Sequence, residues 1–343
     1  MIGKRDALLA VAGIGLFAFA AERIGWSPVI RAIEQGGAAV VIILGLSLVR
    51  LFLQTRAWSI ALRSDGIESA ASRLMLIRLA SQGVGYLSVL GPVASEPMKI
   101  SLLQKSGGSA TTATLVDTGV YWFTSGLVGI AGCVSAALLL AHRPHSVVPV
   151  AIVGTILAVS IFLLARPKSR LSPLVLVLGN RCPRWLHKAQ QIELAVRNFA
   201  NDNPSSIRQM FVLDTACQLL VLGEVVALFW CLNIPLRGVT VLGIEGVTRA
   251  IKIMAGWMPA RIGADESGVA GAFFAFGLAP ASGLTLALAR RSRDLLAALV
   301  GLTWLAWSTQ IWKADSAPIP QAACSAGFSG PCSMEEESTC KLF

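Results

Sequence analysis

Two hydrophobic segments of this chain are interrupted by the stretches GPVASEP, residues 91–97, and MPARIGADE, residues 258–266. Each stretch carries a glutamate, and the offset that aligns Glu96 with Glu266 also aligns a glycine and a hydroxyl residue further along. Paired interruptions at matching places in two halves are typical of membrane transporters, because broken helices leave backbone groups free to bind a polar ligand. We therefore expect the functional site at these two breaks.

The two interruptions contain the residues that most often end or bend a helix. Proline lacks the backbone donor that continues a helix, and glycine adopts backbone angles that other residues avoid. We expect the chain to break at Gly91, Pro92, Pro97, Pro259 and Gly263.

The composition is that of an integral membrane protein. Hydrophobic residues make up 55% of the chain and charged residues 14%, and the mean hydropathy is +0.67. A helix needs about 20 mostly apolar residues to cross the hydrocarbon core of a bilayer. The stretches that approach this length are residues 7–21, 38–53, 127–140, 147–165, 211–232 and 295–311. An all-α polytopic membrane protein with about six crossing helices is expected.

The positions of the cations predict the orientation, since loops rich in lysine and arginine stay in the cytoplasm. Lys4 and Arg5 precede the first apolar stretch, and the connection over residues 166–205 is rich in arginine. We expect both termini in the cytoplasm, with the protein in a bacterial cytoplasmic (inner) membrane. This bias and attraction to anionic lipids account for the net charge of +10, so no nucleic-acid partner is needed.

The two interrupted segments, residues 73–105 and 239–276, are predicted to be re-entrant helical hairpins. The remaining helices then alternate so that the two halves form an inverted-topology repeat. The predicted parts are a first membrane repeat over residues 1–141, a second over residues 142–312 and a disordered cytoplasmic tail over residues 313–343. The alternative for each hairpin is a crossing helix with a proline kink, which membrane helices tolerate.

The connection over residues 166–205 contains a predicted amphipathic helix. Apolar residues such as Trp185 and Phe199 alternate there with charged ones. Such a helix lies on the inner membrane surface with its apolar face buried, or docks against the cytoplasmic surface of the protein itself.

Charged residues in or beside the repeat elements are the candidate transport residues, because charge inside a membrane usually faces a cavity or a partner. Arginine matches phosphate with a planar fork of donors, and the two glutamates could carry protons or compensate the arginines. The candidates are Glu96, Glu266, Arg78, Asp117, Arg249, Arg261, Asp265 and Arg290. Two structural alternatives exist: the glutamates are helix caps, and Arg290 forms a helix-face pair with Asp294 while Arg291 and Arg293 face solvent or head groups.

Short motifs point to a known family. The run from Gly91 to Leu103, followed by residues 107–113, resembles the first motif of the lysylphosphatidylglycerol synthase transmembrane (flippase-like) family. Residues 257–259, 263–266 and 288–291 resemble its second motif.

The chain departs from the family pattern at two places. The family's second motif is usually richer in glycine than Ala264-Asp265, and its first motif is followed by an acidic-basic pair. Here Asp117 keeps the acid, whereas Thr118 stands in place of the base.

The resemblance implies that this chain moves a lipid or lipid-linked intermediate between leaflets. The polar loop and the tail are too short for a synthase domain, so the synthase reaction is not expected. We expect membrane lipids with anionic head groups as ligands. We expect no enzyme activity, no cofactor and no metal. The alternative is a non-catalytic membrane partner of a lipid-modifying or glycosyl-transferring enzyme, which it would hold through residues 166–205.

Overall fold

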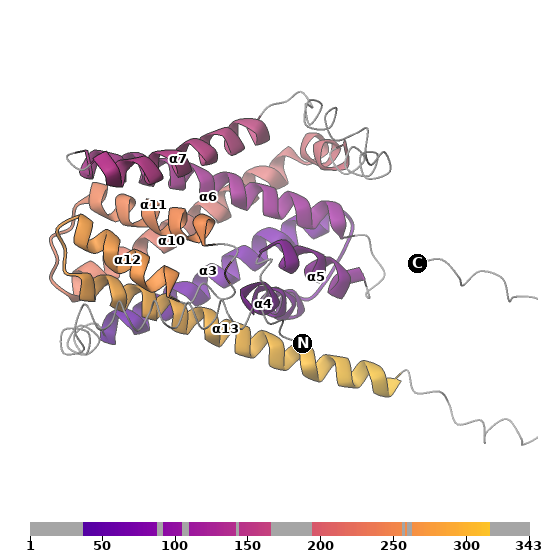
Figure 1. The fold of residues 1–343 in the computed structure, drawn as a ribbon. Helices are drawn as coiled ribbons and strands as arrows, with labels where there is room; N and C mark the ends of the chain where they lie inside the picture. The colour runs from indigo at the N-terminus through magenta and orange to yellow at the C-terminus, as the bar shows by residue number, and fades with distance from the viewer. Residues whose placement is uncertain are drawn as a thin grey trace, which may run out of the picture. The chain divides into compact units, whose positions relative to one another are not determined.

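The computed structural model is helical throughout the part of the chain that it describes. That part comprises residues 37–87, 92–104, 110–141, 144–165, 194–255, 258 and 263–315. The helices are α3 (Gly37–Ser64), α4 (Ala71–Leu87), α5 (Pro92–Gln104), α6 (Thr111–Leu139), α7 (Pro144–Ala165), α10 (Pro204–Cys231), α11 (Gly238–Met254), α12 (Ala264–Ala275) and α13 (Pro280–Asp315) (Figure 1). No strand occurs among these residues, so the predicted all-α class is confirmed.

Contacts divide the chain into two units, Met1–Trp304 and Leu305–Phe343. Only residues 305–315 of the second unit are described, and they are the end of α13. The predicted first crossing helix and nearly all of the predicted tail lie outside the described residues.

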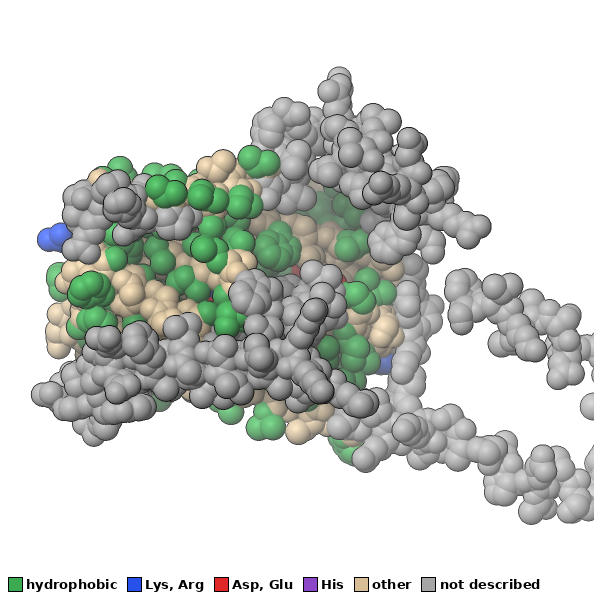
Figure 2. All heavy atoms as spheres, in the orientation of Figure 1, with side chains coloured by type: hydrophobic (Ala, Val, Ile, Leu, Met, Phe, Trp, Pro, Cys, Tyr) green, Lys and Arg blue, Asp and Glu red, His purple; other side chains and the backbone are tan. Residues whose placement is uncertain are grey.

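Three described helices, α3, α6 and α10, are long and apolar enough to cross a membrane. Their outer faces carry large exposed hydrophobic side chains, including Leu48, Leu138 and Trp230. Hydrophobic side chains cover much of the described surface on the face seen in Figure 2. Such a surface is unfavourable in water and suits the hydrocarbon of a bilayer.

Each predicted hairpin is a pair of packed helices. Helix α4 packs against α5, and α11 packs against α12. Helix α5 begins at Pro92, where proline is tolerated because the first turn lacks an amide partner. Gly263 precedes α12 with a φ of 80°, which explains the need for glycine. Gly91 and Pro259 lie outside the described residues.

The prediction that the chain breaks at Pro97 was wrong. Pro97 lies inside α5, which continues to Gln104. A proline near the start of a membrane helix removes one donor, and neighbouring groups can satisfy the freed carbonyl. The break therefore ends before Pro92.

The helices pack through three apolar clusters. Helix α3 packs along α10, and α6 packs against both α7 and α11, so that α6 lies between them (Figure 1). Trp58 and Met210 are fully buried in the cluster around α3, α4 and α6. Phe229 and Phe273 meet edge to face, with ring centroids 6.1 Å apart, where α10 meets α12. These contacts bury the inner faces of the helices and leave their outer faces for lipid.

Two helix crossings depend on glycine. On α11 and α6, Gly246 and Gly132 face each other so closely that a side chain on either would overlap the other helix's backbone. On α13, Gly301 lies equally close to the backbone of Leu79 on α4. The first helix of each hairpin is therefore in backbone contact with a long helix from the other half of the chain.

Part of the connection over residues 166–205 docks on the protein. Residues 194–202 are helical. Phe199 is buried and Val196 half-buried against the cluster that contains Trp58 and Met210. The described end of the predicted amphipathic helix thus packs on the chain itself, while residues 166–193 lie outside the described residues.

Candidate functional site

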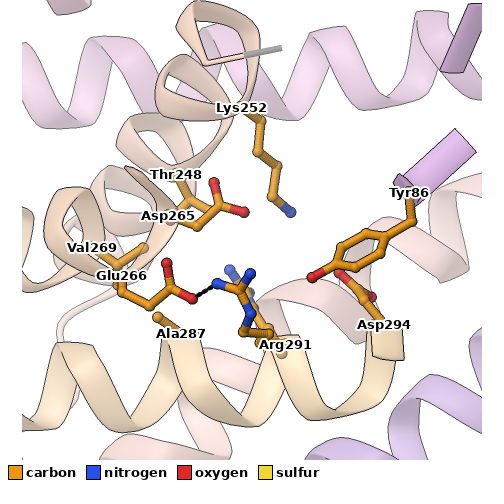
Figure 3. A pocket seen from close by; sticks show the side chains of 10 residues that line it. Tyr86, Thr248, Lys252, Asp265, Glu266, Val269, Ala287, Arg291 and Asp294 are labelled. Atoms are coloured by element: carbon orange, nitrogen blue, oxygen red, sulfur yellow. Dashed lines mark ion pairs between the residues drawn. The ribbon is translucent and has the colours of Figure 1, made fainter. Parts of the chain in front are cut away.

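A small polar pocket lies between the two hairpins. Tyr86 comes from the end of α4 in the first hairpin, and the remaining lining comes from the second hairpin and α13 (Figure 3). The lining residues are Tyr86, Thr248, Lys252, Asp265, Glu266, Val269, Ala287, Arg290, Arg291 and Asp294. The cavity measures about 20 Å³, which is room for about one water molecule. Three cations and three acids therefore face one another at close quarters.

Glu266 ties the second hairpin to α13. One carboxylate oxygen accepts a hydrogen bond from the backbone N–H of Gly263 at 2.8 Å. The other forms an ion pair with Arg291, drawn as a dashed line in Figure 3. The side chain is 1% exposed. Glu266 thus has two roles. It caps its helix, which was the alternative role expected from the sequence, and it is the counter-ion of an arginine in the pocket.

Lys252 brings a further cation to the pocket. Its side chain points from α11 into the pocket, as does that of Tyr86 from α4 (Figure 3). Asp265, Glu245 and Asp294 act on it electrostatically, but Lys252 forms no ion pair within the described part of the chain. Its ammonium group can therefore accept an incoming anion without first losing a bonded partner.

Arg290 lines the pocket and is held by two carboxylates. Its Nε donates to Glu224 of α10 at 2.8 Å, and one terminal nitrogen donates to Glu245 of α11 at 3.0 Å. The other terminal nitrogen, Nη1, is buried and has no hydrogen-bond partner. A buried guanidinium donor without a partner among the described residues is unfavourable, so this nitrogen would gain a hydrogen bond from an anion that reached it.

Glu224 is the centre of a wider ionic network. It also accepts a hydrogen bond from Arg293 at 2.7 Å, and Arg50 of α3 lies 3.9 Å away. Asp294 pairs with Arg293 at 2.9 Å rather than with Arg290. The helix-face pairing of Arg290 with Asp294 was therefore wrong, because carboxylates on α10 and α11 come closer to Arg290.

Arg249 extends this network toward α6. It donates to the backbone carbonyl of Ser125 at 2.8 Å and to the side-chain carbonyl of Gln218 at 2.8 Å. Its Nε lies 3.2 Å from Glu245. The predicted site residue thus braces α11 against α6 and α10 and does not line the pocket.

The remaining predicted residues form a second polar cluster. Arg78 pairs with Asp117 at 3.2 Å and also donates to the backbone carbonyl of Gln54. Glu96 pairs with Lys99 at 2.8 Å and accepts a hydrogen bond from Thr118 at 2.9 Å. This cluster joins the first hairpin to α3 and α6, away from the lining of the pocket.

A family model described as "Lysylphosphatidylglycerol synthase TM region" matches residues 7–301. The chain belongs to this family. The match covers the helices that build both hairpins and the pocket, so the resemblance suggested by the motifs is confirmed. No curated protein and no solved structure matches the chain. Membership identifies an integral membrane protein of lipid metabolism or transport.

In this family member the structure brings only some of the predicted residues together. Asp265, Glu266 and Arg290 line the pocket. Arg249 does not line it but pairs with Glu245, which also pairs with Arg290. Glu96, Arg78 and Asp117 belong to the second cluster, whereas Arg261 lies outside the described residues.

Two acids of this arrangement, Glu224 and Glu245, were not predicted from the sequence as transport candidates. A signal existed for Glu224. Glu224 is the one acid in the apolar stretch 211–232 apart from Asp214, and a charge at such a place usually has a partner inside the protein.

Proposed function

We propose that the protein moves an anionic lipid, or a lipid-linked intermediate with an anionic head group, between the leaflets of the membrane. The observation that carries the proposal is the pocket between the hairpins, where Lys252, Arg290 and Arg291 converge. Burying three cations in a membrane protein is costly unless they serve an anion or a partner. The family match supports a lipid as the ligand.

The chemistry of the pocket fits a phosphate group. Among the described residues, Lys252 supplies an ammonium without an ion pair, and Arg290 supplies the buried Nη1 without a hydrogen-bond partner. A phosphate oxygen that approaches Arg291 competes with Glu266 for the same guanidinium. Glu266 then acts as an internal substitute for the ligand and keeps Arg291 neutralised between transport events.

The pocket as observed is closed. A cavity of about 20 Å³ cannot hold a lipid head group, so the ligand enters only when the hairpins move apart. The acyl chains stay in the bilayer during this step, and only the head group passes between the hairpins. We propose that the two halves rock against each other to expose the pocket to each leaflet in turn.

An inverted repeat would provide this movement, and the order of helices supports it. Helices α3, α4, α5 and α6 have 28, 17, 13 and 29 residues, and α10, α11, α12 and α13 have 28, 17, 12 and 36. The close helix crossings follow the same correspondence between the two halves. Helix α6 meets α11 at Gly132, and its counterpart α13 meets α4 at Gly301. We propose that α4–α5 and α11–α12 are re-entrant hairpins that enter from opposite faces.

We also propose that the protein lies in a bacterial cytoplasmic membrane with both termini in the cytoplasm. The many arginines of residues 166–205 support this orientation. We propose that the protein is a transporter and not an enzyme, with the membrane lipid as its partner.

Leaflet exchange in liposomes tests the proposal. Fluorescent anionic and zwitterionic lipids are placed in liposomes with or without the purified protein, and accessibility to a membrane-impermeant quencher is followed. Faster exchange of the anionic lipid is expected with protein present. Equal rates for every lipid with and without protein would favour the alternative, a membrane partner that holds a lipid-modifying or glycosyl-transferring enzyme through residues 166–205.

A further inference from the structure

A second feature of the bundle, outside the pocket, is a buried carboxyl group with an oxygen that has no hydrogen-bond partner among the described residues. Asp214 of α10 is 1% exposed, and its Oδ2 is buried without a hydrogen bond. Within the described part of the chain, Asp214 forms no ion pair. An ionised carboxylate in this environment would be strongly unfavourable, because no cation of the described residues is bonded to it.

The charges around Asp214 do not balance. Asp117 of α6 and Arg78 of α4 act on it electrostatically, and Arg78 is already paired with Asp117 at 3.2 Å. From α5, Glu96 and Lys99 act on Asp117 and pair with each other. Among the described residues, three carboxylates thus share two cations, and one positive charge is missing.

Other titratable groups nearby do not supply that charge. Arg50 of α3 belongs to the network of Glu224. Cys217 lies one turn from Asp214 on α10, and its thiol bonds weakly to the backbone carbonyl of Arg50. Asp117 is itself incompletely paired, since its Oδ1 is buried without a hydrogen-bond partner among the described residues.

We propose that Asp214 is a proton-binding site, whose proton supplies the missing charge. A proton suits the site better than a metal ion, because no group of three histidine, cysteine or acidic side chains that could hold a metal occurs among the described residues. Protonation converts the carboxylate into a hydroxyl donor and a carbonyl acceptor, and no other bond is made or broken.

The position of Arg78 connects this proton to the pocket. When Asp214 loses its proton, it competes with Asp117 for Arg78. Arg78 and Tyr86 lie on the same helix, α4, and Tyr86 lines the pocket. The loss of the proton thus pulls on the helix that closes one side of the pocket. This coupling of proton uptake to head-group binding rests on the proposed lipid transport, whereas the proton site itself does not.

Infrared spectroscopy tests the proton site without any transport. The full chain in lipid nanodiscs is titrated, and the C=O stretch of protonated carboxyl groups is followed in the wild type and in Asp214→Asn. A buried carboxylic acid band present at neutral pH in the wild type and lost in the variant is expected. Identical bands in the two proteins would overturn the proposal.

Two further variants control this experiment. Asp202→Asn makes the same chemical change at an exposed aspartate, so it should leave the band intact. Asparagine has nearly the shape of a protonated aspartate, so Asp214→Asn is expected to fold; Asp214→Glu should shift the band rather than abolish it. An unshifted band in Asp214→Glu would also overturn the assignment.

Leaflet exchange at several pH values tests the coupling. The exchange rate of an anionic lipid should vary with pH in the wild type, and this variation should be lost in Asp214→Asn. If both proteins show the same pH dependence, the coupling is excluded. If the wild type exchanges no lipid, the proposed function and the coupling fail together, while the infrared band still decides whether Asp214 holds a proton.

Discussion

Glu224 on α10 accepts a hydrogen bond of 2.8 Å from Arg290 on α13, across 66 residues of sequence. The same arginine is held by Glu245 on α11. One guanidinium therefore bridges two helices of the second half and fixes the wall of the pocket. Because both acids are 3% exposed or less, this bridge is a buried ionic network and not a surface salt bridge.

The first prediction concerns this network. Glu224→Gln removes the charge that compensates Arg290 and Arg293, and both cations remain buried. Removing one partner of a buried ionic network costs about 3–5 kcal/mol. The midpoint of thermal unfolding in detergent should fall clearly. Glu68→Gln makes the same change at an exposed acid and should leave the midpoint nearly unchanged; equal midpoints for the two variants would refute the role of Glu224.

The second prediction concerns the crossing of α6 and α11. Gly246→Ala places a methyl group against the backbone at Gly132, on the helix along which α11 packs. Overpacking of this kind destabilises by about 1–3 kcal/mol. Gly119→Ala on α6 is the matched control, since nothing lies near the added methyl. Thermal unfolding should separate the two variants, and a Gly246→Ala protein as stable as the control would contradict the close contact.

The third prediction concerns the pair between Arg78 and Asp117. Each single variant, Arg78→Gln or Asp117→Asn, leaves a buried charge without its partner, whereas the double variant leaves neither. A double-mutant cycle should therefore give a coupling energy of about 0.5–3 kcal/mol. Additive effects on the free energy of unfolding would show that the two side chains do not interact.

The patterns of proline, glycine and glutamate predicted where α5 and α12 begin because those residues act locally. Gly263 has a φ of 80° and Pro92 starts a helix, so both mark their breaks through backbone chemistry alone. Glu266 caps its helix through Gly263, three residues earlier, which is also a local effect.

The partners of the charged residues could not be predicted in the same way. Arg290 pairs with Glu224 and not with Asp294 because the crossing of α10 and α13 decides which carboxylate comes close. Glu96 and Glu266 occupy matching places, yet Lys99 neutralises one and Arg291 the other. Matching positions in two halves thus predict where a helix breaks and do not predict what its acid contacts.

The fourth prediction concerns Glu266 as the internal substitute for the ligand. Glu266→Gln keeps an oxygen for the Gly263 N–H but removes the charge that competes for Arg291. Binding of an anionic lipid should tighten by roughly tenfold, or about 1.4 kcal/mol. Leaflet exchange should slow, because the head group leaves less readily. Titration of the purified variant with lipid, followed by native mass spectrometry, measures the affinity; unchanged affinity would exclude competition.

Transport through the pocket is tested most directly by comparing lipid exchange by the wild type with that by Lys252→Gln. Lys252 is the pocket cation without an ion pair within the described residues, so its loss should spare the fold and weaken the attraction for an anionic head group. Arg56→Gln removes one exposed cation and serves as the control. We expect exchange of a fluorescent anionic lipid to fall several-fold in Lys252→Gln and to stay normal in Arg56→Gln. Anionic lipid exchange at the wild-type rate in a folded Lys252→Gln protein would show that the pocket does not bind the head group.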